Sequence, residues 1–257
     1  MKQYLKTATS ALQQSRQIIH QYFRQSYTIE NKADASPVTI ADKSAEDAIR
    51  QVIMSNHPDH GILGEEHGIH NPESSYQWII DPIDGTKSFI SGSPIFGTLI
   101  SLTHQTKHIM GIIDMPMLDE RWIGIQGEPT LLNNNQCEIS TVQKLQQAKM
   151  FCTDSNMFSG NQLECFEQIT SQVQLRRFGG DCYSYGLLAS GHIDLVVEGC
   201  LQYYDIAALV PVVEGAGGFI TDWQGKPLTK DLNGLVVAAS TKELHQAAIE
   251  ILSAVDR

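Results

Sequence analysis

The stretch WIIDPIDGTKSF, residues 78–89, runs out of an apolar segment into two carboxylates three residues apart. The apolar residues predict a buried strand, YQWIID, that ends at Asp81. Pro82 has a fixed φ and no N–H group, so we expect it to break the strand where Asp81 and Asp84 splay apart. Gly85 allows the backbone to approach a ligand closely, and a helix is expected to begin directly afterwards.

A second pair of acids, Glu65 and Glu66, closes the segment GILGEEHG, which predicts a short strand turning into a loop. If that strand converges with the one ending at Asp81, three or four carboxylates face one spot. Like charges a few ångströms apart raise each other's pKa values and cost free energy unless a cation neutralises them. Oxygen ligands, with the Ile83 carbonyl offered beside Asp84, suit Mg²⁺ better than zinc. The sequence therefore predicts a magnesium site.

The residues after these acids predict a phosphate site beside the metal. The free N–H groups of Gly85 and Thr86, at the start of a helix, would point at an anion, and the Thr86 hydroxyl can orient a water. A sharp Asx-type turn is the simpler alternative, and it accounts for Asp84 and Gly85. It leaves the other acids unexplained.

A haloacid-dehalogenase phosphatase is a further alternative, because its D-x-D-G-T strand end looks much like D-P-I-D-G-T. In that chemistry the first aspartate is the nucleophile and the acid two residues later shuttles a proton, so both roles depend on that spacing. Asp81 and Asp84 are three residues apart, and the motif lies far from the start of the chain. We therefore favour direct attack of water over a covalent aspartyl intermediate.

Composition excludes several classes of protein. The chain of 257 residues has 18 Lys and Arg against 29 Asp and Glu, a formal net charge of −11 that argues against nucleic-acid binding. No apolar run approaches the roughly 20 residues of a membrane span, and the N-terminal residues lack the apolar stretch of a signal peptide. We expect a cytoplasmic protein that binds no membrane.

Cysteine and histidine give little support to other metal or redox chemistry. The five cysteines are widely spaced with no C-x-x-C pair, which favours reduced core thiols. The histidine pairs 57/60 and 67/70 have helical spacing, but Pro58 and Gly68 interrupt them, so neither is favoured as a zinc site.

Periodicity along the chain predicts two halves. Residues 1–147 should form an α+β half with an antiparallel sheet and the metal-binding loop, and residues 148–257 an α/β half carrying substrate-pocket residues. Expected helices are 3–26, one starting near Asp42, 161–172, 183–191, 203–218 and 242–255. Expected strands are 61–64, 76–81, 96–104, 108–116, 120–127, 149–154, 173–180, 193–199 and 234–240. Residues 30–42 are expected as a polar loop, and 219–228 as a hairpin-like excursion.

Three segments together resemble the signature regions of the inositol monophosphatase family of Mg²⁺-dependent, Li⁺-sensitive phosphatases. They are GEE at 64–66, WIIDPIDGTKSF at 78–89 and YYDIAALVPVVEGAGG at 203–218. The similarity covers nearly the whole chain. Within the family, FGGDCYSYGLLASGHIDLVVEGCLQYYDIAAL resembles most closely the inositol-monophosphatase-like histidinol-phosphatases. The resemblance implies a layered α-β-α-β-α sandwich of the α/β class, commonly a homodimer, that acts on a small phosphorylated metabolite.

The resemblance also implies roles for individual residues. It makes Glu65, Asp81, the Ile83 carbonyl, Asp84 and Asp205 metal ligands, with Asp42 helping to bind a further, weaker ion, for two or three Mg²⁺ in all. The catalytic residues would be Glu65, Asp81 and Thr86, with Glu65 and Thr86 positioning the attacking water. The substrate-binding residues would be Gly85, Thr86, Asp181, Glu198 and Asp205. The purely structural alternative for Asp205 is that its side chain is the N-cap of the following helix.

The preferred substrate rests on Asp181 and Glu198. Two acids beside an anionic phosphate would repel a neutral or acidic leaving group, whereas histidinol carries an ammonium and an imidazole that can be cationic. Histidinol phosphate is therefore the predicted substrate. The alternative for Asp181, from its position, is an N-cap of the helix CYSYGLLASG. Inositol 1-phosphate, fructose 1,6-bisphosphate and adenosine 3′,5′-bisphosphate remain alternatives, and a non-catalytic scaffold of the same fold is an alternative of a different class.

Overall fold

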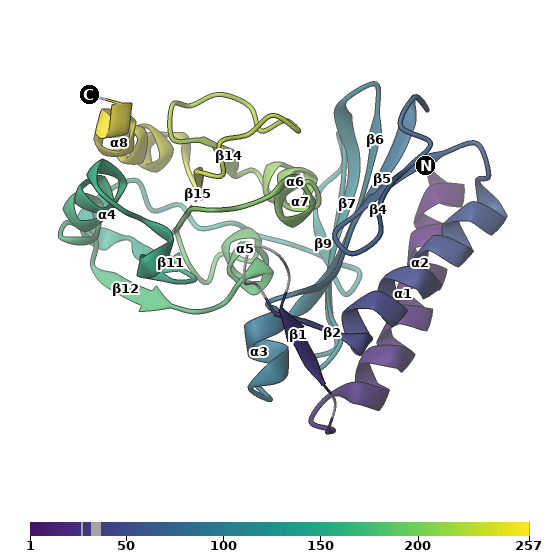
Figure 1. The fold of residues 1–257 in the computed structure, drawn as a ribbon. Helices are drawn as coiled ribbons and strands as arrows, with labels where there is room; N and C mark the ends of the chain where they lie inside the picture. Colours follow the sequence, from purple (N-terminus) through teal and green to yellow (C-terminus); the bar gives the residue numbers. More distant parts are fainter. Residues whose placement is uncertain (27, 32–36, 257) are drawn as a thin grey trace.

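The computed structural model describes residues 1–26, 28–31 and 37–256, and it is a mixed α/β fold in five layers (Figure 1). Among these residues the strands form an eight-stranded sheet, a five-stranded sheet and a separate two-stranded ribbon. One pair of helices covers the outer face of the larger sheet, a second group lies between the sheets, and another pair covers the smaller sheet. The predicted layered α-β-α-β-α architecture is confirmed.

The larger sheet has the strand order β10-β9-β8-β7-β6-β5-β3-β4. Its centre is the predicted antiparallel meander from β5 to β8, in which each strand pairs with the next. Beside it, β3 runs parallel to β5 and carries the GEE segment at its end. The strands are β3 (Gly61–Gly64), β4 (Gly68–His70), β5 (Tyr76–Asp84), β6 (Gly97–His104), β7 (Lys107–Met115), β8 (Glu120–Ile125), β9 (Leu131–Leu132) and β10 (Asn135–Gln136).

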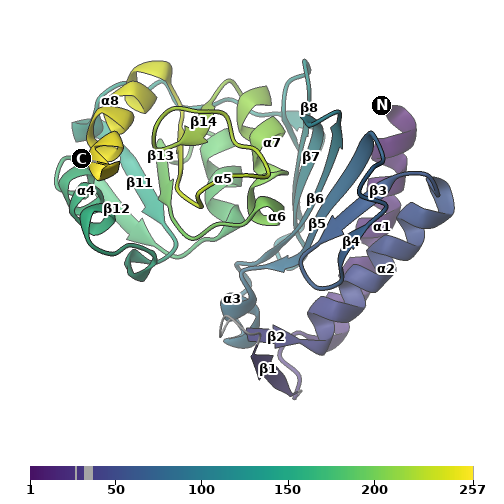
Figure 2. The ribbon, with the colours of Figure 1, turned by 45° about the horizontal axis from the view of Figure 1, so that its top comes forward.

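Two long helices, α1 (Lys2–Tyr22) and α2 (Ile40–Asn56), pack on the outer face of this sheet (Figure 2). Apolar side chains at helical spacing, such as Leu12 and Ile49, meet the strand residues Trp78 and Ile100 in one buried cluster. Helix α1 ends four residues earlier than predicted, because the chain leaves helical geometry at Phe23.

The start of α2 also differs from the prediction. The helix begins at Ile40, and Asp42 lies inside its first turn, where it forms a capping box with Thr39. The predicted loop of residues 30–42 is in part a ribbon of β1 (Ile29–Asn31) and β2 (Pro37–Thr39). Its residues 32–36 lie outside the described residues.

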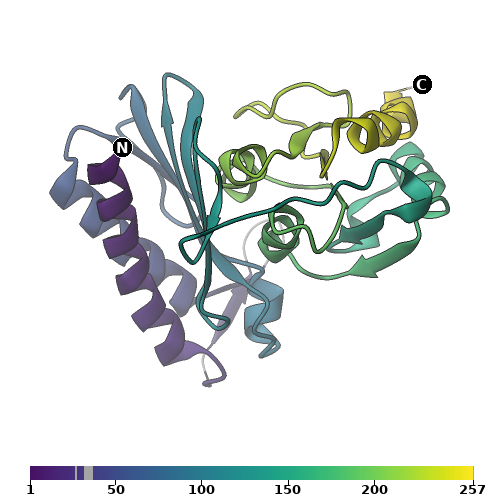
Figure 3. The same ribbon diagram turned by 180° about the vertical axis from the view of Figure 1, so that it is seen from behind.

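The smaller sheet has the order β12-β11-β13-β15-β14 and mixes parallel and antiparallel pairs. Its strands are β11 (Lys149–Cys152), β12 (Leu175–Phe178), β13 (Leu195–Glu198), β14 (Phe219–Asp222) and β15 (Val236–Ala239). The segment 219–228, expected as an excursion, instead supplies the edge strand β14. Helices α4 (Asn161–Thr170) and α8 (Lys242–Leu252) cover the outer face of this sheet. Figure 3 shows the whole molecule from behind.

Four short helices complete the fold. Helix α3 (Thr86–Ile90) follows β5, and α5 (Cys182–Ala189), α6 (Tyr203–Ile206) and α7 (Leu209–Gly215) lie between the two sheets (Figure 1). Side chains of α5 and α7 join those of both sheets in one buried cluster that includes Trp122 and Val196. The single helix expected over 203–218 is therefore two helices. Pro211 accounts for the break, since it has no N–H group to donate to the carbonyl four residues earlier.

Helices long and apolar enough to span a membrane are absent from the part of the chain that the structure describes.

Candidate active site

The strand β5 passes through the acidic motif instead of ending at it. Its pairing with β6 shifts register between Asp81 and Asp84, so the segment is a bulge within the strand. The prediction that Pro82 ends the strand is wrong, because the chain resumes pairing at Asp84. The Thr98 hydroxyl donates to the Pro82 carbonyl at 2.8 Å, and the Ile83 N–H donates to Asp81 Oδ1 at 3.0 Å. The bulge sends both carboxylates towards the same cavity.

Gly85 makes the corner between this strand and helix α3, as the sequence predicted. Its φ of 88° lies in the left-handed region, where a side chain is strained. A Cβ at this position would also lie 2.9 Å from Asp181 Oδ2. The next residue, Thr86, places its hydroxyl 3.2 Å from the Ile83 carbonyl and 3.5 Å from Asp42 Oδ1. The corner therefore brings the Thr86 hydroxyl beside the acids.

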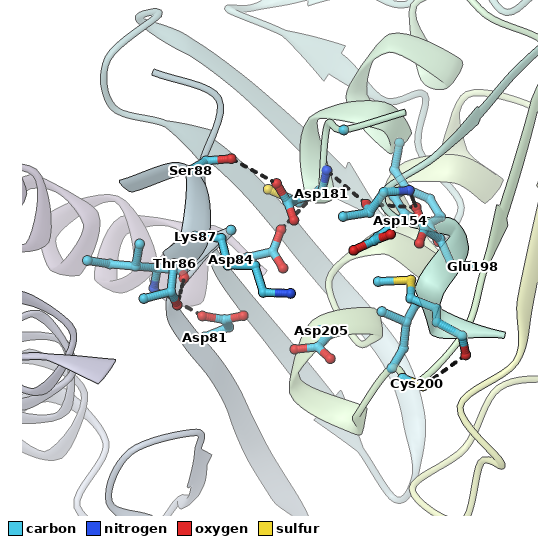
Figure 4. Close-up of a pocket in the computed structure, with 18 of the residues that line it drawn as sticks. Asp81, Asp84, Thr86, Lys87, Ser88, Asp154, Asp181, Glu198, Cys200 and Asp205 are labelled. Atoms are coloured by element: carbon cyan, nitrogen blue, oxygen red, sulfur yellow. Dashed lines mark hydrogen bonds between the residues drawn. The ribbon is translucent and has the colours of Figure 1, made fainter. Parts of the chain in front are cut away.

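Asp81, Asp84 and Asp205 form the centre of the site (Figure 4). One carboxylate oxygen from each lies within 4.8 Å of the others. Asp205 comes from α6, a helix that contacts β5. The structure thus brings together acids that are more than 120 residues apart in the sequence, as predicted.

Burial and mutual repulsion raise the pKa values of these acids. Burial, followed by the charges of Glu65 and Asp84, raises the pKa of Asp81 well above its usual value. Burial and the Asp181 charge raise the pKa of Asp84 to about 7, and the pKa of Asp205 also rises for the same kinds of reason. Glu65 lines the same cavity at the end of β3, so the predicted convergence of the two strands is observed. A cluster of this kind favours a bound divalent cation.

Asp205 is held at the start of its helix by a local hydrogen bond. Its Oδ2 accepts from the Gln202 N–H at 2.7 Å, in a capping box in which Gln202 is the N-cap residue. Asp205 is the third residue of the helix, so the alternative that it is the N-cap is wrong. The bond leaves its carboxylate facing Asp81 and Asp84.

Asp42 occupies a different place from the other predicted ligands. It is fully buried at the start of α2, and it accepts from the Thr39 N–H at 2.8 Å. It is not among the described residues that line the cavity, which it approaches through the Thr86 hydroxyl. Burial raises its pKa. A role for Asp42 in holding a further Mg²⁺ stays a prediction.

The cavity has a volume of about 580 Å³, large enough for a phosphorylated metabolite. Among the described residues that line it, Lys87 is the single basic side chain. The acidic lining residues are Glu65, Asp81, Asp84, Asp154, Asp181, Glu198 and Asp205. An anionic substrate would be repelled by this lining in the absence of cations.

Glu198 lies across the cavity from Asp81, and Asp181 lies beside Asp84 (Figure 4). Glu198 is buried and its Oε1 accepts from both the N–H and the hydroxyl of Thr153 at 2.9 Å, whereas its Oε2 has no hydrogen-bond partner among the described residues. Asp181 Oδ2 accepts from the Ser88 hydroxyl at 3.3 Å. Burial raises the pKa of Glu198 to about 8 and that of Asp181 to about 6.

Asp181 stands at the N-cap position of α5, but its side chain makes no capping hydrogen bond. Asp84 takes that role instead, because its Oδ2 accepts from the Cys182 N–H at 2.6 Å. The alternative in which Asp181 serves as a capping side chain is therefore wrong. Its carboxylate is available to the cavity.

Several lining residues were not predicted from the sequence. Thr153 links the two wall acids, because its hydroxyl lies 3.1 Å from the Asp181 N–H and 2.9 Å from Glu198 Oε1. Lys87 and Ser88 follow the predicted motif directly, and both lower the pKa of Asp181. Their position after Thr86 on a short helix was the signal that could have identified them.

The histidine residues are absent from the described lining of this cavity. His57 and His60 stack at 4.7 Å in an aromatic group with Tyr4, Tyr76 and Trp78, far along the sheet. The cysteines are free thiols, of which Cys200 is exposed and Cys182 is buried, and both line the cavity.

The donor set fits a hard divalent cation. Three carboxylates within one ligand sphere, with Glu65 and the Ile83 carbonyl on the same cavity wall, offer oxygen atoms alone. Burial and the neighbouring carboxylates raise the pKa values of Asp81, Asp84 and Asp205, so a bound cation would favour their ionised forms. Mg²⁺ prefers such ligands.

Comparison with known proteins gives a consistent set of relatives. A model of the inositol monophosphatase family matches residues 1–257. The chain is 47% identical over 247 residues to the bifunctional phosphatase IMPL2, chloroplastic, of Arabidopsis thaliana, covering 93% of this chain and 71% of that protein. It is 34% identical over 236 residues to a histidinol-phosphatase of Chlorobaculum parvum, covering 91% of each.

A solved structure agrees with these relatives. The inositol monophosphatase from Zymomonas mobilis superimposes with a TM-score of 0.90 at 40% sequence identity, covering 98% of each chain.

Removing the charge of one central acid should nearly abolish turnover of a phosphomonoester. We expect Asp84→Asn and Asp205→Asn each to lower kcat about 100-fold or more, because even outer-sphere partners of metal ligands cost 10- to 100-fold when changed. Asp231→Asn, at an exposed position outside the cavity, is the matched control and should retain activity. Steady-state kinetics at saturating Mg²⁺ measure the effect, and near-normal kcat in either variant would refute the ligand assignment.

The metal-free protein should lose stability as the pH rises. Asp84 and Glu198 have folded pKa values of about 7 and 8, above their ordinary values of 3.8 and 4.5. A raised folded pKa stabilises the folded state below the unfolded pKa, and this contribution is lost as the pH passes through the folded value. Thermal unfolding in a chelator should therefore give a lower Tm at pH 8.5 than at pH 5.5.

The variant Glu198→Gln separates this effect from the general charge of the chain. It should reduce the pH dependence of Tm, since the titrating group is gone. A Tm that is constant or rises over this range, or an undiminished slope in the variant, would contradict the expectation.

Proposed function

The chain belongs to the inositol monophosphatase family, and from this premise we propose that it is a histidinol-phosphatase, converting L-histidinol phosphate and water to L-histidinol and phosphate. As a member of the family it is a metal-dependent phosphatase of small phosphorylated substrates. The observation that carries this proposal is the pair of wall acids, Asp181 and Glu198, which line the same cavity as the metal acids. The name of the Chlorobaculum relative supports it, while that of the more similar Arabidopsis relative leaves the substrate open.

The wall acids suit a cationic leaving group. Glu198 presents a buried oxygen without a hydrogen-bond partner among the described residues, and Asp181 presents a carboxylate that accepts from the Ser88 hydroxyl at 3.3 Å. An ammonium or imidazolium placed between them would form charge-assisted hydrogen bonds, each contributing roughly 1.5 to 3 kcal/mol. A bound cation would also favour the ionised forms of both acids. A leaving group carrying a second phosphate would meet only repulsion.

Inositol 1-phosphate is the second candidate. Burial raises the pKa of Glu198 to about 8, so its neutral carboxyl can donate a hydrogen bond to a polyol hydroxyl near neutral pH. The similarity to the Zymomonas inositol monophosphatase supports this candidate. A non-catalytic scaffold is less well supported, because Glu65, Asp81, Asp84, Thr86 and Asp205 are all present around one cavity.

In the proposed mechanism, Mg²⁺ would be held by Glu65, Asp81, the Ile83 carbonyl, Asp84 and Asp205. When bound, it supplies positive charge that neutralises the phosphoryl oxygens and lowers the pKa of water.

The remaining roles fall to the strand–helix corner. The N–H groups of Gly85 and Thr86 are proposed to hold the phosphate. Glu65 and the Thr86 hydroxyl are proposed to position the attacking water, with Thr86 oriented in turn by the Ile83 carbonyl at 3.2 Å. Asp81 is proposed to act beside them as ligand and as acceptor for the Ile83 N–H. Direct attack needs no protein nucleophile, which agrees with the three-residue spacing of the two aspartates.

Other parts of the proposal rest on the family alone. They are occupancy by two or three Mg²⁺, a homodimeric assembly and sensitivity to Li⁺; a cytoplasmic location is proposed from the sequence pattern instead.

Removing the Thr86 hydroxyl should impair the chemical step more than substrate binding. We expect Thr86→Ala to lower kcat roughly 100-fold, because a misplaced reacting group costs about that much, and to change KM less. Thr86→Ser keeps the hydroxyl and is the matched control, so it should retain most of the activity. Losses of equal size in kcat and in substrate affinity for Thr86→Ala would argue against a role in positioning water.

Removing Asp181 should change the choice of substrate. We expect Asp181→Ala to lower kcat/KM for histidinol phosphate roughly 10- to 100-fold, the equivalent of one charge-assisted hydrogen bond, with a smaller effect on inositol 1-phosphate. The assay panel also includes fructose 1,6-bisphosphate and adenosine 3′,5′-bisphosphate, which the wild-type chain should use poorly.

The control is Asp154→Ala, which removes another acid of the same cavity whose Oδ1 instead accepts from the Asn156 N–H at 2.9 Å. An equal drop in this variant would indicate general electrostatics instead of recognition. If Asp181→Ala affects both substrates equally, or if the wild type prefers inositol 1-phosphate, the histidinol phosphate assignment fails. Hydrolysis of none of the four substrates would favour the scaffold.

A further inference from the structure

A row of three small residues crosses the larger sheet beneath the α6–α7 corner. Ser101 on β6 pairs with Gly111 on β7, and Gly111 pairs with Gly124 on β8. Residues directly paired in an antiparallel sheet point to the same face. The three positions therefore form a continuous row on the face that α6 and α7 cover (Figure 2).

The two glycines are needed for close approach and not for backbone freedom. A Cβ at Gly111 would lie 2.1 Å from the Ala208 carbonyl oxygen, and one at Gly124 would lie 2.3 Å from the Pro211 carbonyl oxygen. Neither glycine has a positive φ, so another residue would suit the strand conformation. The helix backbone thus rests directly on the sheet backbone at both points.

Ser101 completes the row by binding a carbonyl that the helix leaves unsatisfied. Pro211 has no N–H group, so the carbonyl four residues earlier, that of Ala207, lacks its helical donor. The buried Ser101 hydroxyl lies 2.9 Å from the Ala207 oxygen and 3.0 Å from the Met110 oxygen of its own sheet, and its single proton is shared between them. The contact links the sheet to the exact break between α6 and α7.

This contact lies two residues from Asp205. The Gln202 cap fixes the Asp205 carboxylate relative to its own helix. The row of small residues fixes that helix relative to the sheet, whose strand β5 carries Asp81 and Asp84. An outward shift of the corner would move Asp205 away from the other two acids, which lie within 4.8 Å of it.

We propose that Ser101, Gly111 and Gly124 are positioning residues of the metal site. They set the distance of Asp205 from Asp81 and Asp84. The inference rests on the metal site of the proposed function and is independent of which phosphomonoester the enzyme uses. None of the three residues lines the cavity among the residues described, so they act through the α6–α7 corner alone.

The test is the affinity of the full-length protein for Mg²⁺ alone, measured by titration calorimetry and by the Mg²⁺-dependent rise in Tm. Ser101→Ala removes the hydroxyl without adding bulk, and Gly111→Ala pushes on the Ala208 carbonyl. Each should weaken Mg²⁺ binding roughly 10- to 100-fold, the range found for residues that orient metal ligands. Ser101→Ala decides the test if Gly111→Ala does not fold.

The control is Ile53→Val, which trims a fully buried side chain between α2 and the sheet. It should lower Tm without changing the dissociation constant for Mg²⁺. An unchanged dissociation constant in Ser101→Ala would overturn the proposal, as would an equal weakening in Ile53→Val, which would reflect stability alone. Failure of the wild type to bind Mg²⁺ would overturn both the metal site and the positioning role of these three residues. A preference for another substrate would leave the positioning role unaffected.

Discussion

Three carboxylates, those of Asp81, Asp84 and Asp205, repel one another at the centre of the site, and the structure around them must offset that repulsion. Their oxygens lie within 4.8 Å of one another, and burial raises the pKa of each. Such an arrangement is unfavourable in a folded chain unless a cation or protons offset it. The surrounding structure therefore has to hold the acids together against their own charge until a metal binds.

Two kinds of contact provide this restraint. On the sheet side, the bulge of β5 is fixed by the Thr98 hydroxyl on the Pro82 carbonyl. Across the cavity, Asp84 accepts from the Cys182 N–H at 2.6 Å, so a metal-site acid also caps a helix of the second half of the chain. The wall acids belong to the same system, because Thr153 joins Glu198 to the start of α5. The site thus lies between the two halves of the chain, and residues of both halves line it.

Local patterns predicted most of the strands and the acids of GEE and D-P-I-D-G-T, whereas the layered fold and the place of Asp205 in the cluster were predicted from the resemblance to the family. Apolar alternation marks the strands, and the carboxylates of D-P-I-D-G-T are visible at a strand end. The continuation of β5 past Pro82 was missed, since a bulge depends on its pairing with β6. The break at 207–208 was missed although Pro211 is visible, because the apolar run continues through it.

Long-range contacts account for the rest. Thr153 has no signal of its own, because its role depends on Glu198 and Asp181 from other elements. Gly111 and Gly124 are visible as glycines inside strands, which indicates close approach of another backbone, but the sequence does not say which. The capping of α5 by Asp84 instead of Asp181 likewise follows from the tertiary structure alone.

We expect the acid cluster to release protons when it binds a divalent cation. Calorimetric titration of Mg²⁺ into the metal-free protein at pH 7, in two buffers of different protonation enthalpy, measures the protons released on binding. The raised pKa values predict a net release of protons and a dissociation constant that tightens as the pH rises from 6 to 8. Binding with no proton release and no dependence on pH would contradict the account.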